Sequence, residues 1–133
     1  MKHRLLGEVE IVETETARRN FEGLERHILA EESGDIETTM DTMTADPFWI
    51  NHGTQTDLNG YEAVRRRYAG RFRDRPGMHV DIQRTIVTET VAVLQGSNNP
   101  GKRGERRTPL LIWVEFQGGK LAGEISYSNP TEK

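Results

Sequence analysis

Two long runs of strand-forming residues near the C-terminus, 108–116 and 121–128, are joined by Gln117-Gly118-Gly119-Lys120. Two glycines between such runs are typical of a tight β-hairpin. Pairing the runs regularly about this turn places Trp113 opposite Glu124 on one face and leaves the second face apolar throughout. A sheet that is buried on one side only has one plainly polar face. We therefore expect both faces of the hairpin to be covered, one by helices and one by a second subunit.

Helical periodicity precedes this hairpin. Apolar residues recur every three or four positions over 14–32, over 36–43 and again over 60–72, which predicts three amphipathic helices. Asn59 followed by Glu62 fits a capping box at the start of the third helix.

Strand patterns occupy most of the remaining chain. We expect strands at 48–52, 79–87, 90–95, 108–116 and 121–128, with loops over 53–58 and 96–107. Alternation over the second of these strands predicts one shared face for Val80, Ile82 and Ile86. Helices followed by a meandering antiparallel sheet predict a single α+β domain over residues 1–133, in which 1–13 could form an N-terminal extension.

The composition excludes several classes of protein. The chain has 133 residues, no cysteine and a net charge of −3. The absence of cysteine excludes disulfide scaffolds, cysteine-ligated zinc and thiol catalysis, and the negative charge argues against a non-specific nucleic-acid binder. No apolar run reaches the roughly 18 residues of a membrane span, and the N-terminus turns acidic too early for a signal peptide. We therefore expect a cytoplasmic protein that binds neither nucleic acid nor membrane.

The order of these elements resembles the nuclear transport factor 2-like fold, and within it the SnoaL-like polyketide cyclases. Three patterns carry the resemblance. They are Ser33-Gly34-Asp35 for the junction of the first two helices, Trp49-Ile50-Asn51-His52 with Gly60-Tyr61-Glu62-Ala63-Val64-Arg65 for a strand and the third helix, and Gly119-Lys120-Leu121 for the closing hairpin. The similarity covers nearly the whole chain, from Thr14 to Pro130.

The resemblance implies three N-terminal helices packed on a strongly curved, mainly antiparallel sheet, a cone-shaped α+β barrel of the cystatin-like type. It also implies a deep apolar pocket in which a small molecule undergoes acid–base chemistry without a cofactor, such as cyclisation, isomerisation or dehydration. Members commonly form homodimers through the outer face of the sheet. Other members only bind ligands or assemble, because the fold does not fix the function.

Individual residues match the family in part. Asn51 matches the pocket asparagine of the cyclases, His52 its usual neighbour, and Trp49 an aromatic position of the pocket wall. The pocket histidine of the cyclases falls near Asn98, and the acid of their last strand falls near Ser126, where this chain has no carboxylate. These departures count against a standard cyclase.

Glu124 is the strongest candidate for an acid or base. It lies two residues before Ser126, and so on the same face of its strand. A carboxyl beside Trp113 in an apolar pocket is desolvated, which raises its pKa towards the working pH. Glu115 shares that face nearer the turn and could divide acid and base roles with Glu124. If this face is turned outward, both are solvated strand carboxylates instead.

Other side chains could polarise or stack on the substrate. Asn51 can donate a hydrogen bond to a carbonyl or enolate oxygen, or else satisfy a local turn. The imidazole of His52 can move protons either way, but strict alternation turns it away from Asn51 unless the chain bends at Gly53. Trp49 and Trp113 can stack on a flat substrate, or belong to the core.

The densest basic run lies on the third helix, from Arg65 to Arg75. An inward stripe of Val64, Tyr68 and Phe72 sends most of these arginines to solvent. We interpret them as a solvated face. An RNA or phosphate site is the minor alternative, because no aromatic residue alternates with the arginines as a stacking platform for bases requires. No metal site is predicted, since the other histidines share no ligand spacing: His3, His27 and His79.

The sequence therefore predicts an enzyme that performs proton transfer on an apolar, carbonyl-bearing small molecule, without cofactor or metal. The predicted catalytic residues are Glu124, His52 and Asn51, and the predicted substrate-binding residues are Trp49, Trp113, Asn98, Glu115 and Ser126. The alternative is a non-catalytic ligand-binding or assembly module of the same fold.

Overall fold

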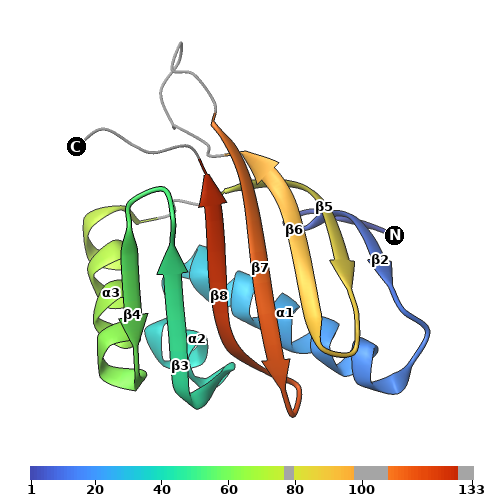
Figure 1. Ribbon diagram of the computed structural model, residues 1–133, viewed down its shortest axis with the longest axis horizontal. Coiled ribbons are helices and arrows are strands. Elements are labelled where there is room, and N and C mark those ends of the chain that lie inside the picture. The colour runs from blue at the N-terminus through green and yellow to red at the C-terminus, as the bar shows by residue number, and fades with distance from the viewer. Residues whose placement is uncertain (77–79, 98–107, 129–133) are drawn as a thin grey trace.

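The computed structural model describes residues 1–76, 80–97 and 108–128. Within these ranges, three helices lie on one side of a curved eight-stranded sheet (Figure 1). This arrangement confirms the predicted α+β class. The sheet is open, with β1 and β4 at its edges, so it does not close into a barrel.

The strand order is β1-β2-β5-β6-β7-β8-β3-β4. The strands are β1 Lys2–His3, β2 Gly7–Ile11, β3 Met43–Asn51, β4 Thr56–Asn59, β5 Asp81–Val87, β6 Val91–Ser97, β7 Pro109–Gln117 and β8 Lys120–Ser128. Neighbouring strands are antiparallel, except that β2 runs parallel to β5 and β3 runs parallel to β8. The β3–β8 pairing sets a strand from the first half of the chain beside the closing hairpin, which is where the candidate site forms.

The helices are α1 Glu15–Ser33, α2 Ile36–Asp41 and α3 Tyr61–Asp74. The side chain of Thr14 accepts a hydrogen bond from a backbone N–H of the first turn of α1, and Gly34 ends this helix at a φ of 73°. Asp35 then caps α2 in the same way. The three helices follow the predicted order. In the described ranges, none is both long and apolar enough to span a membrane.

Several predicted boundaries around the second and third helices are wrong. α2 is shorter than expected, because Met43 already begins β3. Pro47 lies inside β3, in the stretch where its register with β8 shifts, a place where a sheet tolerates proline. β4 begins at Thr56, so a strand takes up the second half of the loop expected over 53–58. The capping box is absent, since Gly60 is the N-cap of α3 and no side chain caps that end.

Residues 1–13 contribute to the sheet. β1 pairs with β2, and β2 pairs in parallel with β5. Leu5, Leu6 and Val9 of this segment are buried. The segment therefore adds apolar side chains to the core.

A bulge in the closing hairpin changes which side chains face inward. Phe116 pairs with Leu121, but Glu115 pairs with Gly123, so β8 carries one extra residue. Every pair beyond this point is displaced by one position, and Glu124 faces Val114. The predicted pairing of Trp113 with Glu124 is therefore wrong, because a displacement of one residue moves a side chain to the other face.

β5 contains a similar irregularity, between Ile82 and Arg84. Beyond it Thr85 and Val87 are buried, whereas Ile86 is exposed. The predicted shared face of Ile82 and Ile86 is therefore wrong, for the same physical reason.

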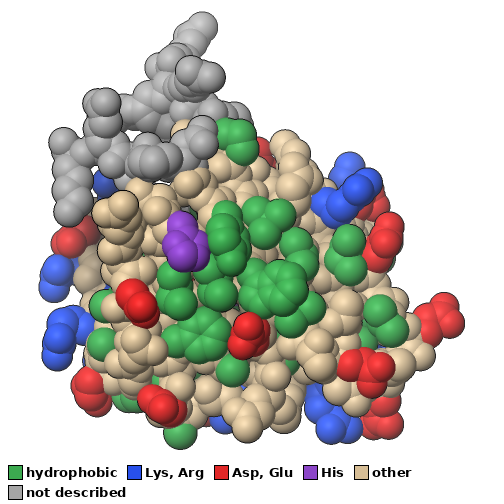
Figure 2. Space-filling model, in the orientation of Figure 1, with side chains coloured by type: hydrophobic (Ala, Val, Ile, Leu, Met, Phe, Trp, Pro, Cys, Tyr) green, Lys and Arg blue, Asp and Glu red, His purple; other side chains and the backbone are tan. Residues whose placement is uncertain are grey.

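Both faces of the sheet carry apolar side chains. Ile112 and Val114 belong to the core beneath the helices, whereas Leu111 and Tyr127 point away from it and are 36% and 46% exposed. Figure 2 shows hydrophobic side chains gathered at the centre of this outer face, over β7 and β8. Both faces of the hairpin thus carry apolar side chains, and the helices cover one of these faces.

Candidate functional site

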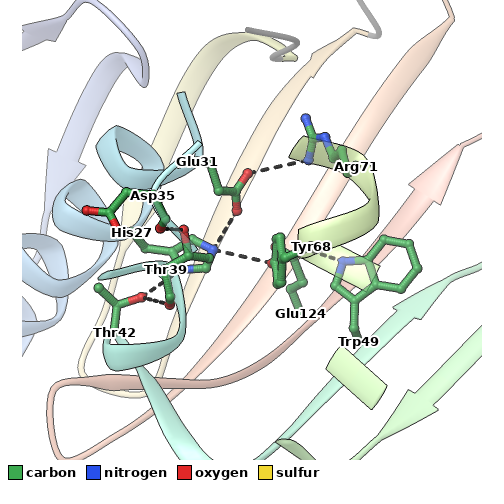
Figure 3. Close-up of polar contacts among 9 residues, drawn as sticks. All are labelled: His27, Glu31, Asp35, Thr39, Thr42, Trp49, Tyr68, Arg71 and Glu124. Atoms are coloured by element: carbon green, nitrogen blue, oxygen red, sulfur yellow. Dashed lines mark hydrogen bonds and ion pairs between the residues drawn. The ribbon is translucent and has the colours of Figure 1, made fainter. Parts of the chain in front are cut away.

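Glu124 of β8 lies in register with Trp49 of β3. Nε1 of Trp49 donates a hydrogen bond of 2.6 Å to Oε1 of Glu124, and the hydroxyl of Tyr68 on α3 donates one of 3.2 Å to the same oxygen (Figure 3). Trp49 and Tyr68 are buried. Burial raises the pKa of Glu124, and the nearby negative charge of Glu31 raises it further.

His27 and Glu31 form a second polar group, one turn apart on α1. Nε2 of His27 lies 2.6 Å from Oε1 of Glu31, and Nδ1 lies 2.7 Å from Oγ1 of Thr42 (Figure 3). The hydroxyl of Thr42 donates its own proton to the carbonyl oxygen of Thr39 at 2.7 Å, so it accepts from Nδ1. Both ring nitrogens of His27 therefore carry protons, and the side chain is an imidazolium cation.

The surroundings shift the pKa values of the two glutamates in opposite directions. Burial lowers the pKa of His27, but the charge and hydrogen bond of Glu31 outweigh it and raise that pKa. Burial raises the pKa of Glu31, but the charge and hydrogen bond of His27 and the charges of two arginines outweigh it and lower that pKa. Glu31 is therefore the ionised carboxylate of the cluster, and Glu124 is the one whose neutral form is favoured.

Tyr68 connects the two groups. Its hydroxyl oxygen lies 3.4 Å from Nε2 of His27 while it donates to Glu124. Burial raises the pKa of Tyr68 well above its ordinary value, so the phenol keeps its proton and remains a donor. A protonated phenol beside a carboxyl with a raised pKa can polarise a carbonyl oxygen while the carboxyl moves a proton.

Two arginines of α3 turn toward this cluster. Cζ of Arg67 lies 3.9 Å from the centre of the Trp49 ring. Nη1 of Arg71 lies 3.5 Å from Oε2 of Glu31 (Figure 3). The sequence predicts that most arginines of α3 face solvent. Arg67 and Arg71 are exceptions, whereas Arg65 pairs with Glu37 at the surface.

Three of the predicted site residues come together. Trp49 and Glu124 share a hydrogen bond, and Ser126 is buried on the same face of β8. Asn51 lies in register with Ser126. Its side-chain oxygen accepts a hydrogen bond of 3.2 Å from the backbone N–H of Thr54, the turn-stabilising role that the sequence left open.

Three others lie on the outer face, which corrects the prediction that they share a site with Glu124. Nε1 of Trp113 donates a hydrogen bond of 3.2 Å to Oε2 of Glu115, two residues along the same strand. The ring of His52 packs against that of Tyr127, with centroids 4.9 Å apart. The bulge in β8 and the alternation of β3 cause these placements. Asn98 lies outside the described residues.

The sequence analysis missed most of the polar cluster: His27, Glu31, Arg67, Tyr68 as a donor, and Arg71. A signal for the first two was present. Asn20, Leu24 and His27 lie on the inward stripe of α1 at helical spacing, and Glu31 continues it one turn later. A histidine and a glutamate at i and i+4 on a buried stripe predict a buried ion pair.

Within the described ranges, no three histidine, aspartate or glutamate side chains gather as metal ligands would. A shallow surface depression lies between α1 and α2 and is separate from the Glu124 cluster. Its lining includes Glu22, Arg26, Leu29 and Thr38.

Comparison with known proteins identifies the family. The SnoaL-like domain profile matches residues 24–124, and the chain belongs to this family. No curated protein matches the chain significantly in sequence.

Solved structures share the fold at low identity. An NTF2-like protein of unknown function from Mesorhizobium loti is 12% identical, with a TM-score of 0.73 over 92% of this chain and 98% of that one. A cystatin-fold protein from Novosphingobium aromaticivorans is 20% identical, with a TM-score of 0.66 over 81% and 97%. A protein from Shewanella denitrificans assigned as a SnoaL-like polyketide cyclase is 14% identical, with a TM-score of 0.67 over 83% and 90%. The predicted NTF2-like, cystatin-like fold is confirmed.

Proposed function

We propose that this protein catalyses cofactor-free proton transfer on an apolar, carbonyl-bearing small molecule, in a cyclisation, isomerisation or dehydration. The observation that carries the proposal is the carboxyl of the half-buried Glu124, whose pKa is raised by desolvation and which accepts hydrogen bonds from Trp49 and Tyr68. A carboxyl with a raised pKa can take a proton and return it. Membership of the SnoaL-like domain family supports the assignment.

The geometry divides the roles within the cluster. Both hydrogen bonds reach Oε1 of Glu124, so we assign proton transfer to Oε2. In its carboxylate form Glu124 takes the proton from the carbon next to the carbonyl, and in its acid form it returns that proton to the product. Tyr68 has one hydroxyl proton, so it stabilises the enolate oxygen, in place of the predicted Asn51 and His52, by turning this donor from Glu124 to the substrate. The His27 cation favours the charged form of Glu124, which is the carboxylate that takes the proton from the substrate.

Hydrogen–deuterium exchange tests this proposal without knowledge of the natural substrate. The protein is incubated with 2-tetralone, a flat apolar ketone, in deuterated buffer, and loss of the α-proton signals is followed by NMR. We expect exchange faster than in the buffer blank, and a decrease of about 10²- to 10⁴-fold in Glu124→Gln. Glu10→Gln is the matched control, because Glu10 is an exposed glutamate on β2.

Unchanged exchange in Glu124→Gln would contradict the proposed role of this residue. If the wild-type protein gives exchange no faster than the blank, the enzymatic proposal fails. The non-catalytic ligand-binding module then becomes the better account, in agreement with the close packing of Arg67 on the Trp49 ring beside Glu124.

We also propose that a second copy of the chain covers the outer face of the sheet. Exposed apolar side chains on this face, including Ile86, Leu111 and Tyr127, support the proposal. Sedimentation equilibrium should show a dimer that Tyr127→Asp dissociates. A wild-type monomer would contradict it.

A further inference from the structure

Arg67 is a half-buried cation with one buried donor atom that lacks a hydrogen-bond partner. Its Nη1 atom is inaccessible to solvent and bonds to no atom of the residues that the structure describes. The ion pairs among those residues involve other arginines of α3, namely Arg65, Arg71 and Arg73. Because an unsatisfied buried donor costs free energy, such a group in a native protein calls for an explanation.

Stacking fixes the direction in which this guanidinium can bind. Cζ of Arg67 lies 3.9 Å from the centre of the Trp49 ring and 5.7 Å from that of the Tyr68 ring. A guanidinium held by its flat face keeps its N–H groups in its own plane, where they form a fork that matches a carboxylate. The aromatic rings therefore hold the side chain in place without using its donors.

Arg67 lies close to the carboxyl that we assign to proton transfer. The indole that it covers is the same one whose Nε1 donates to Glu124. Glu31, the ionised carboxylate of the cluster, is bonded to His27 and Arg71 rather than to Arg67. An anion bound by Arg67 would thus be separated from the Glu124 carboxyl by the Trp49 indole.

We propose that Arg67 binds a carboxylate group of the ligand, so that the substrate class is a flat, apolar carbonyl compound that also bears a carboxylate. This inference rests on the proposed function for the position of the reacting carbonyl, but its binding step stands by itself. Burial lowers the pKa of the Arg67 guanidinium, which an anionic partner would counteract.

Calorimetric titration with a matched pair of probes tests the inference. The probes are 2-naphthoate and 2-naphthamide, which have the same ring system and differ in charge. We expect the wild-type protein to bind 2-naphthoate about 10-fold more tightly or better, as a charge-assisted hydrogen bond would give. Arg67→Met should abolish this preference. Arg66→Met should keep it, because Arg66 is an exposed neighbour on the same helix and the change in net charge is identical.

Arg67→Lys is a second variant that keeps the test valid if Arg67→Met fails to fold. It keeps the charge and loses the fork, so its preference for the carboxylate should fall between those of the wild type and Arg67→Met. Equal binding of the two probes by the wild type, no binding of 2-naphthoate, or an unchanged preference in both Arg67 variants would overturn the inference.

The exchange assay separates this inference from the proposed function. If 2-tetralone exchanges in a Glu124-dependent manner while the naphthoate preference is absent, the inference fails and the proposed function stands. If the preference depends on Arg67 but exchange equals the blank, Arg67 marks a binding site for carboxylates and the proposed catalysis fails.

Discussion

Each side of the sheet holds a glutamate, a tryptophan and a histidine, and the two sets have different surroundings. On the helix side Trp49 donates to Glu124, and His27 of α1 lies next to Tyr68, which also donates to Glu124. On the outer side Trp113 donates to Glu115, and an exposed histidine, His52, packs on Tyr127. The contact between indole and carboxyl is common to both sides.

Burial and neighbouring charge distinguish the inner set. Glu124 lies against Tyr68 and near the charges of Glu31 and His27. Burial and the charge of Glu31 raise its pKa, whereas the charge of His27 lowers it. A tryptophan–glutamate hydrogen bond alone therefore does not define a candidate site. The same pair acquires acid–base character where water is excluded and a second charged group lies within reach.

Replacement of the two histidines should give the largest difference between the sides. His27→Ala empties a buried position and leaves the half-buried Glu31 without its closest partner, at 2.6 Å, and should lower the free energy of unfolding by about 3–5 kcal/mol. His52→Ala removes an exposed ring and should cost about 0.5 kcal/mol. Urea denaturation of both variants measures the difference. Equal losses would remove the distinction between the two faces.

Replacement of each tryptophan by phenylalanine sharpens the comparison, because it removes the indole N–H and keeps an aromatic ring. Trp49→Phe should cost about 1–3 kcal/mol in unfolding free energy, since it removes the buried indole donor from Glu124. Trp113→Phe should cost about 0.5 kcal/mol, because Glu115 can turn to water. Chemical denaturation monitored by circular dichroism reports both, and a larger loss for Trp113→Phe would contradict this account.

The pH dependence of stability should reflect the inner glutamate. The folded-state pKa of Glu124 is raised, so its contribution is fully present below the ordinary value of 4.5 and is lost as pH rises through the folded pKa. Glu124→Gln should therefore flatten the fall of unfolding free energy as pH rises above 4.5, by up to about 1.4 kcal/mol per pH unit. Glu115→Gln is the control, and an equal flattening in that variant would contradict the assignment.

Much of the fold could be predicted from the sequence, because periodicity and turn residues are local signals. The inward stripe of α1, its end at Gly34 and the Gly118-Gly119 turn all follow from such signals. β4 and the cap of α3 do not follow from local signals, since tertiary contacts determine them.

The candidate site could be predicted only in part. Glu124 and Trp49 were identified, and the structure joins them. Their assumed partner Trp113 was not correct, because a bulge of one residue leaves no clear mark in a sequence yet turns every later side chain to the other face. His27 and Arg67 were missed because polar residues on helices are usually solvated, and only their spacing relative to the apolar stripe signals otherwise.

The most direct test of the central claim is an NMR titration of the side-chain carboxyl carbon of Glu124, assigned by its disappearance in Glu124→Gln. The account predicts a midpoint above the ordinary glutamate value, because burial and the charge of Glu31 favour the neutral acid. A midpoint at or below that ordinary value would show a solvated or fully ion-paired carboxylate, and would contradict the assignment of Glu124 as the group that transfers the proton.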